Sequence, residues 1–94
     1  MSCRIDRVVS GDDRVVLRVS GRIHEESVGT LRELLEREKY GVVIDLEEVI
    51  LVDREAVGLL AWSEMKGTEL RNCPAYVREW VNQETTRIGS EDQI

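Results

Sequence analysis

One segment, residues 42–62, constrains the fold of this chain more than any other. It opens with a run of β-branched residues, Val42 to Ile44, which is typical of a central strand covered on both faces. Asp53 follows at the place of a helix N-cap, because the residues after it are apolar with helical spacing. A buried strand, a short turn and a helix in this order indicate an α/β domain, in which the residues after a parallel strand often form the working site.

Strands and helices alternate along the rest of the chain. The first two strands are expected to form a hairpin through a turn at 11–13, and Gly67 lies where a left-handed helix C-cap is favoured. In the second strand, Val15, Leu17 and Val19 point to one face of the sheet. The opposite face receives the polar residues Arg14, Arg18, Ser20 and Arg22, so it is predicted to be wet. We expect strands at 3–9, 14–23, 42–46 and 68–71, and helices at 25–39, 53–66 and from Pro74 to about Glu84.

The fold class predicted from this order is α/β: a small two-layer domain with a mixed sheet of about four strands and helices mainly on one face. Ninety-four residues suffice for one modest core and no second domain. We expect the domain to span residues 1–84. Residues 85–94 are expected to form a polar tail, mobile or lying loosely on the domain, because they contain few apolar side chains.

Composition excludes several classes of function. The 19 acidic and 13 basic residues give a net charge of -6, which opposes binding to nucleic acids and anionic membranes. No apolar stretch approaches the roughly 20 residues that span a bilayer, and no signal peptide begins the chain, so a cytoplasmic location is expected. Cys3 and Cys73 lack Cys-x-x-Cys spacing and are interpreted as ordinary buried, reduced thiols. Neither a metal site nor a cofactor is predicted.

The predicted turn and its flanks resemble the STAS domain, the module of anti-sigma factor antagonists and sulfate transporters. The residues that carry the resemblance are Asp45-Leu46 after the strand, Val49, Asp53 and Val57-Gly58-Leu59-Leu60. Gly21-Arg22-Ile23 is similar to the family's Gly-Arg-Leu or Gly-Glu-Leu, with His24 where an Asp is usual. The resemblance covers roughly residues 4–84. It implies the STAS fold and a protein partner such as an anti-sigma factor or a serine kinase.

In signalling STAS domains the turn reads Asp-Ser-Ser-Gly or Asp-Ser-Thr-Gly, and a kinase phosphorylates the second residue after the Asp. This chain reads Asp53-Arg54-Glu55-Ala56, so Glu55 stands at the position equivalent to the phospho-acceptor. One interpretation of Glu55 is a helix-start carboxylate, stabilised by the helix dipole by ~0.3–1 kcal/mol. The other is an incomplete mimic of a phosphorylated state, with one negative charge in place of roughly 1.5 to 2.

The second predicted helix carries more apolar residues than one buried face can use. At about 100° per residue, Trp62 and Met65 fall with Gly58 on the side opposite the main apolar cluster. Either neighbouring helices cover Trp62 and Met65, or the two form part of a protein-binding patch. The candidate partner-binding residues are His24, Asp53, Arg54, Glu55, Ala56, Gly58, Trp62 and Met65.

The residues indicate a docking edge at the start of the second helix, and the resemblance implies a non-catalytic interaction domain that docks there on an anti-sigma factor or a kinase-like protein. A homodimer is also among the expectations. Three alternatives stay open. The first is a STAS subunit of a membrane transport complex. The second is a small-ligand-binding domain. The absence of a Gly-rich loop argues against it. The third is a small acid/base enzyme using His24, Asp53 and Glu55, although no nucleophile or metal set accompanies them.

Overall fold

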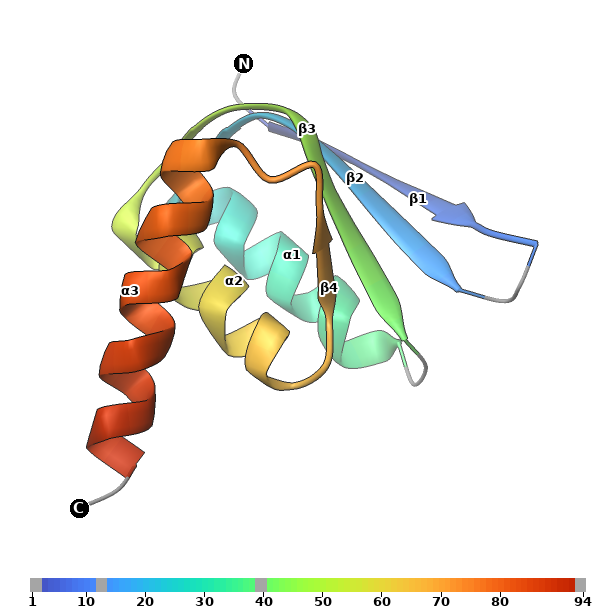
Figure 1. Ribbon diagram of the computed structural model, residues 1–94. Helices are drawn as coiled ribbons and strands as arrows, with labels where there is room; N and C mark the ends of the chain where they lie inside the picture. Colours follow the sequence, from blue (N-terminus) through green and yellow to red (C-terminus); the bar gives the residue numbers. More distant parts are fainter. Residues whose placement is uncertain (1–2, 12–13, 39–40, 93–94) are drawn as a thin grey trace.

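The computed structural model of the protein describes residues 3–11, 14–38 and 41–92. The three helices lie together on one side of the sheet (Figure 1), so the predicted two-layer α/β architecture is confirmed. The elements in chain order are β1 (Cys3–Val9), β2 (Val15–Ile23), α1 (Glu25–Arg37), β3 (Val42–Val52), α2 (Arg54–Met65), β4 (Glu69–Arg71) and α3 (Ala75–Asp92).

The sheet has four strands in the order β1-β2-β3-β4. β1 pairs antiparallel with β2, whereas the pairs β2–β3 and β3–β4 are parallel. The mixed sheet and the opening hairpin are therefore as predicted. Of the predicted turn at 11–13, residues 12 and 13 lie outside the described residues, as does residue 39 of the predicted first helix.

The core lies between the sheet and the three helices. The inward side chains of β2 are buried, with Val15, Leu17 and Val19 at 6%, 0% and 1% exposure, while Arg18 and Arg22 on the other face are exposed. The helices complete the core with fully buried side chains from α2 and α3: Val57, Leu60, Ala61, Val77 and Val81. One dry face and one wet face explain why the domain has two layers.

β3 is longer than predicted. The sequence predicts a strand that ends at Leu46, yet the strand continues to Val52, because Glu48 and the residues after it still pair with β2. The register with β2 shifts twice along this stretch, between Arg18 and Ser20 and between Gly21 and Arg22. These shifts place buried side chains at every third residue of β3, and they bring the end of β3 beside the end of β2.

α2 ends as the sequence predicts. Gly67 has a φ of 106°, the left-handed region that glycine adopts at no steric cost. The amide of Thr68 donates to the carbonyl of Ser63 at 3.0 Å and that of Gly67 donates to Glu64 at 3.1 Å, which is the Schellman pattern. This cap turns the chain sharply into β4.

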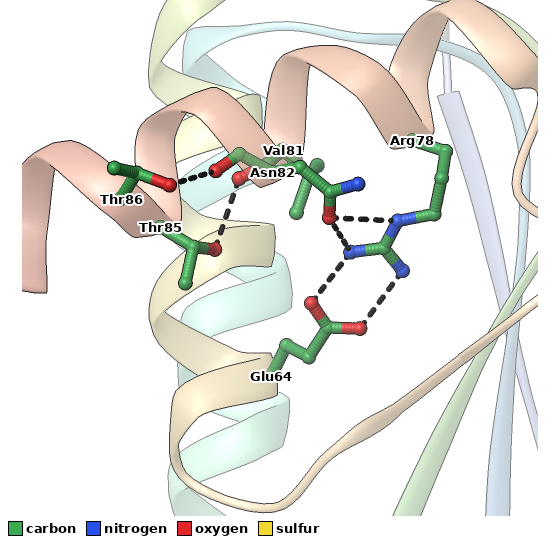
Figure 2. A network of polar contacts seen from close by, with 6 residues as sticks. All are labelled: Glu64, Arg78, Val81, Asn82, Thr85 and Thr86. Atoms are coloured by element: carbon green, nitrogen blue, oxygen red, sulfur yellow. Dashed lines mark hydrogen bonds and ion pairs between the residues drawn. The ribbon is translucent and has the colours of Figure 1, made fainter.

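α3 is joined to α2 by a network of polar contacts (Figure 2). The Arg78 guanidinium donates to both carboxylate oxygens of Glu64, at 2.8 and 2.6 Å, and to the side-chain oxygen of Asn82. Next to this network, Val77 and Val81 are fully buried, and Trp80 packs against the core. A planar, two-pronged ion pair beside apolar contacts sets how α3 lies on α2.

Beyond Glu84 the chain differs from the expected loose tail. α3 continues without a break to Asp92, and Ile88 packs against the core. Val77, Val81, Glu84 and Ile88 recur at spacings of four, three and four residues, so they form one stripe along α3 that faces the domain. α3 continues beyond Glu84 because Ile88 extends the apolar contact between the helix and the core.

Both cysteines are free thiols. They are only half-buried, where the sequence predicts full burial, because Cys3 lies on the edge strand β1 and Cys73 in the loop before α3. Partial burial raises the pKa of the Cys73 thiol above its ordinary value.

Candidate functional site

A single residue, Asp53, joins the end of β3 at Val52 to the start of α2 at Arg54. Its side-chain oxygen accepts a hydrogen bond from the amide of Ala56 at 2.8 Å, so Asp53 is the predicted N-cap. Its own amide donates to the carbonyl of Ile23 at 3.2 Å. The start of α2 is thereby fixed to the ends of both β2 and β3.

The next three residues of α2 divide between solvent and core. Arg54 and Glu55 are exposed in the first turn, where Glu55 meets the positive end of the helix dipole. Ala56, which the sequence groups with them, is 1% exposed and belongs to the core. It points inward because it shares the sheet-facing side of α2 with Leu59 and Leu60. A molecule that approaches this edge therefore meets Arg54 and Glu55.

His24 lies at the same edge of the sheet. It is the N-cap residue of α1, with extended backbone angles and no hydrogen bond from its side chain to the helix. Its carbonyl accepts from Val28, and the preceding residue, Ile23, is the one that binds the amide of Asp53. The starts of α1 and α2 are therefore neighbours (Figure 1), which brings His24 close to Asp53 as the parallel strands predict.

A groove of about 680 Å³ runs between α1 and α2. Two glycines, Gly29 and Gly58, widen it, since a Cβ added at either would meet no atom within 4 Å. Arg32 from α1 and Glu55 from α2 supply a positive and a negative side chain to its lining. The lining residues are Val28, Gly29, Arg32, Glu55, Gly58, Leu59, Trp62 and Ile88.

Trp62 and Met65 are not covered by neighbouring helices. Their exposed fractions are 41% and 46%, which is high for large apolar side chains. The ammonium group of Lys66 lies 5.2 Å from the centroid of the Trp62 ring, a cation–π contact that holds one face of the ring. Trp62 also borders a second hollow, of about 330 Å³, beside the last turn of α2.

The end of α3 completes the candidate site. Glu84 is 9% exposed and accepts hydrogen bonds from the Arg87 guanidinium. This hydrogen bond lowers the pKa of Glu84 below its ordinary value against the effect of burial, and the charges of Arg87 and Arg54 act in the same direction. Ile88 lines the groove together with Glu55, which places this part of α3 beside the start of α2.

The structure thus gathers Glu55, Gly58 and Trp62 in one groove, with Asp53, Arg54 and His24 at its end and Met65 further along α2. Sequence reasoning missed the residues that α1 and α3 contribute: Val28, Gly29, Arg32 and Ile88. A signal for Val28 and Gly29 existed, since small and apolar residues on a predicted surface helix mark a place where something packs. Ile88 carried no such signal because it was assigned to the tail.

Two other features are absent from the described residues. No helix within residues 3–11, 14–38 and 41–92 is long and apolar enough to cross a membrane. Across the same residues, no cluster of three or more His, Cys, Asp or Glu side chains is arranged to hold a metal ion.

No model of a known protein family matches the chain, and no curated protein matches it. Among solved structures, it is similar to the crystal structure of an antisigma-factor antagonist, STAS domain, from Rhodobacter sphaeroides, at 23% sequence identity. The TM-score is 0.57, and the match covers 74% of this chain and 84% of that one. This agreement concerns the backbone, and with the strand and helix order above it confirms the architecture that the sequence resemblance predicts. The chain has a STAS-like fold.

Proposed function

We propose that this chain is a non-catalytic, cytoplasmic interaction domain that docks the start of α2 on an anti-sigma factor or a kinase-like protein. One observation carries the proposal: Glu55 stands exposed at the start of α2 and lines a groove of about 680 Å³ with the half-exposed Trp62. The likeness to an antisigma-factor antagonist supports the class of partner. Glu55 occupies the position at which signalling STAS domains carry the phospho-acceptor.

The composition of the groove suits a protein partner. Leu59 and Trp62 provide apolar surface, Gly29 and Gly58 leave room for an incoming side chain, and aromatic residues are favoured at the centres of interfaces. The charges of Arg32 and Glu55 come from the two helices that form the walls, so they favour one orientation of the bound segment.

The role of Asp53 supports a function without catalysis. Its carboxylate is already engaged as the cap of α2, at 2.8 Å from the amide of Ala56. A general base must instead be within hydrogen-bond reach of a substrate proton. Asp53 is accordingly assigned to holding the edge in shape, and Glu55 and Arg54 to contact with the partner.

In this proposal the Glu55 carboxylate takes the place of the phosphate that related domains gain and lose at this position. A single carboxylate imitates a phosphoserine only in part, because the phosphate carries roughly -1.5 to -2 charge and a third oxygen. The chain would therefore hold one binding state, insensitive to a kinase that transfers phosphate to a hydroxyl.

Binding and stability of the wild type, Glu55→Gln and Glu55→Ser distinguish docking from simple helix-start chemistry. We expect each variant to change the Kd for a purified anti-sigma factor by tenfold or more in calorimetric titration, while the free energy of unfolding falls by at most about 1 kcal/mol. Glu36→Gln, an exposed acid at the far end of α1, is the matched control. Unchanged binding by both Glu55 variants would reject the proposed edge.

Phosphorylation gives an independent readout. After incubation with a STAS-directed serine kinase and ATP, intact mass measurement should detect no phosphate on the wild type and one phosphate on Glu55→Ser. Stoichiometric phosphate on the wild type would contradict the assignment of Glu55 to the acceptor position.

A further inference from the structure

The face of the sheet that the helices leave uncovered carries an ordered row of charges. The strand register pairs Asp6 with Arg18, Arg18 with Asp45, and Asp45 with Arg71. The row therefore crosses all four strands and alternates negative, positive, negative, positive. Asp6, Arg18 and Arg71 are exposed and Asp45 is half-buried. We call these residues the charge row.

An apolar row lies next to it on the same face. Val8 pairs with Val16, and Val16 pairs with Val43, one pleat along the strands from the charge row. Val8 is 45% exposed and Val16 is half-buried, although none of the three helices in the described residues covers this side. The uncovered face therefore offers apolar surface beside neutralised charge, which is the composition of a polar protein interface.

Within one copy, the residues of the charge row do not form ion pairs with one another. Asp6 binds Arg4 at 3.2 Å, Asp45 accepts a hydrogen bond from Asn72 at 3.2 Å, and Arg71 pairs with Glu69 at 3.3 Å. Arg18, although it lies between two acids, forms no hydrogen bond or ion pair with another residue in the described part of the chain. Its guanidinium, with five donors in a flat fork, is available to a carboxylate from outside.

We propose that this face binds a second copy of the same chain through a two-fold axis that runs parallel to the strands, between β2 and β3. This axis places β1 opposite the partner copy's β4, and β2 opposite its β3. Asp6 then faces Arg71 and Arg18 faces Asp45, so every contact of the charge row joins opposite signs. In the adjacent row, Val16 lies opposite Val43, which is only 1% exposed, and Val8 lies opposite Glu69, so the charge row supplies most of the contact.

The alternation selects this orientation. A two-fold axis along the charge row itself would set each residue against its own copy, and like charges would meet at all four positions. The proposal is independent of the proposed function, because the start of α2 and its groove lie on the helical side of the sheet.

The size of the face sets the expected strength. Four strands about 4.8 Å apart, and nine residues of β2 at about 3.3 Å each, span at most roughly 600 Å² per copy. Stable interfaces bury about 800 Å² per partner. The dimer is therefore weak and concentration-dependent, and because its contacts are largely charged, added salt weakens it.

The test uses Arg18→Glu and Asp45→Arg, measured by sedimentation velocity at low salt over a concentration series. Each variant alone places like charges at the centre of the interface and should be monomeric. In a 1:1 mixture, the glutamate at position 18 of one variant faces the arginine at position 45 of the other, and Asp45 of the first faces Arg18 of the second. The outer contacts between Asp6 and Arg71 are unchanged, so all four contacts are again complementary in the proposed orientation. We expect the mixture to form heterodimers at least as readily as the wild type forms homodimers.

Arg37→Glu, at an exposed position of α1 outside the groove, is the control, since it makes the same charge change on the helical side and should leave the wild-type dimer intact. Circular dichroism and cooperative unfolding verify each fold. If Asp45→Arg does not fold, Asp6→Arg and Arg71→Glu provide the same comparison at the outer positions. A monomeric wild type, single variants that still dimerise, or a mixture of folded variants that fails to associate would each overturn the proposal.

Discussion

Arg78 on α3 and Glu64 on α2 share two hydrogen bonds, at 2.6 and 2.8 Å, although both side chains are one-third exposed. This pairing raises the pKa of Arg78 above its ordinary value. Since Ile88 lines the groove from further along the same helix as Arg78, the pair helps to determine where Ile88 lies.

Replacing Glu64 with Gln should therefore lower the free energy of unfolding by about 1 kcal/mol, the magnitude of a well-formed but partly solvated ion pair. Urea denaturation of wild type, Glu64→Gln, Arg78→Met and the double variant measures the coupling between the two residues. Glu79→Gln, an exposed acid on the same helix, is the control and should be neutral. Strictly additive losses in the double variant would mean that the pair contributes nothing to stability.

Gly58 and Gly67 should respond in opposite ways to alanine. Gly58 lies inside α2 with open space where a Cβ would be, so Gly58→Ala should stabilise the helix by about 0.5–1 kcal/mol. Gly67→Ala should destabilise the protein by about 1 kcal/mol or more, because its φ of 106° is strained for alanine. Thermal unfolding of both variants tests the signs of the two stability changes. Equal shifts in Tm would contradict the different roles assigned to Gly58 and Gly67. Gly58→Ala should also narrow the groove and weaken partner binding.

Met65 should tolerate a charge. Because its side chain is 46% exposed, Met65→Glu should unfold cooperatively with a stability change of about 0.5 kcal/mol or less. Leu60→Glu, at a position of the same helix that is 0% exposed, should lose the cooperative transition. If Met65 contributes to the docking surface, its variant should also bind the partner more weakly than wild type. Loss of cooperativity in Met65→Glu would assign Met65 to the core.

The lowered pKa of Glu84 predicts that the stability of the protein depends on pH. Because its pKa is lowered in the folded state, its contribution to stability is fully present above the unfolded pKa of about 4.3 and is lost as pH falls through the folded value. Arg87→Met removes the main cause, so this variant should differ from wild type at neutral pH and converge with it in acid. Unfolding measured from neutral pH to about pH 2, with Arg22→Met as the control for loss of one charge, tests this. If the difference in stability between wild type and Arg87→Met persisted unchanged in acid, Arg87 would act through packing and not through its charge.

Where one local signal dominated, the sequence predicted the fold well. The alternation of Val15, Leu17 and Val19 placed β2, Asp53 placed the start of α2, and Gly67 placed its end. Each of these residues acts through its own backbone or through its immediate neighbours. Such effects are readable without knowing what lies across the sheet.

The misjudged boundaries depend on distant residues. From Leu46 to Val52 the buried positions recur at every third residue, a spacing that fits neither a regular strand nor a helix. This spacing arises from register shifts against β2, which no local pattern reveals. At the end of α3, Glu84 interrupted the apolar stripe, and only contact with the core explains why Ile88 continues it. The groove was missed for the same reason, because α1 and α3 contribute to it from far along the chain.

The two edges of the sheet differ in their exposure to misassembly. β4 is three residues long, with charged Glu69 and Arg71 at its ends, and such a short, charged edge gives a foreign strand little to pair with. β1 presents seven residues, and the charges of its first part give way to Val8 and Val9, at 45% and 57% exposure. At high expression levels, aggregation by strand addition should therefore begin at the tip of the opening hairpin, and a lysine at Val9 should suppress it without disturbing the core.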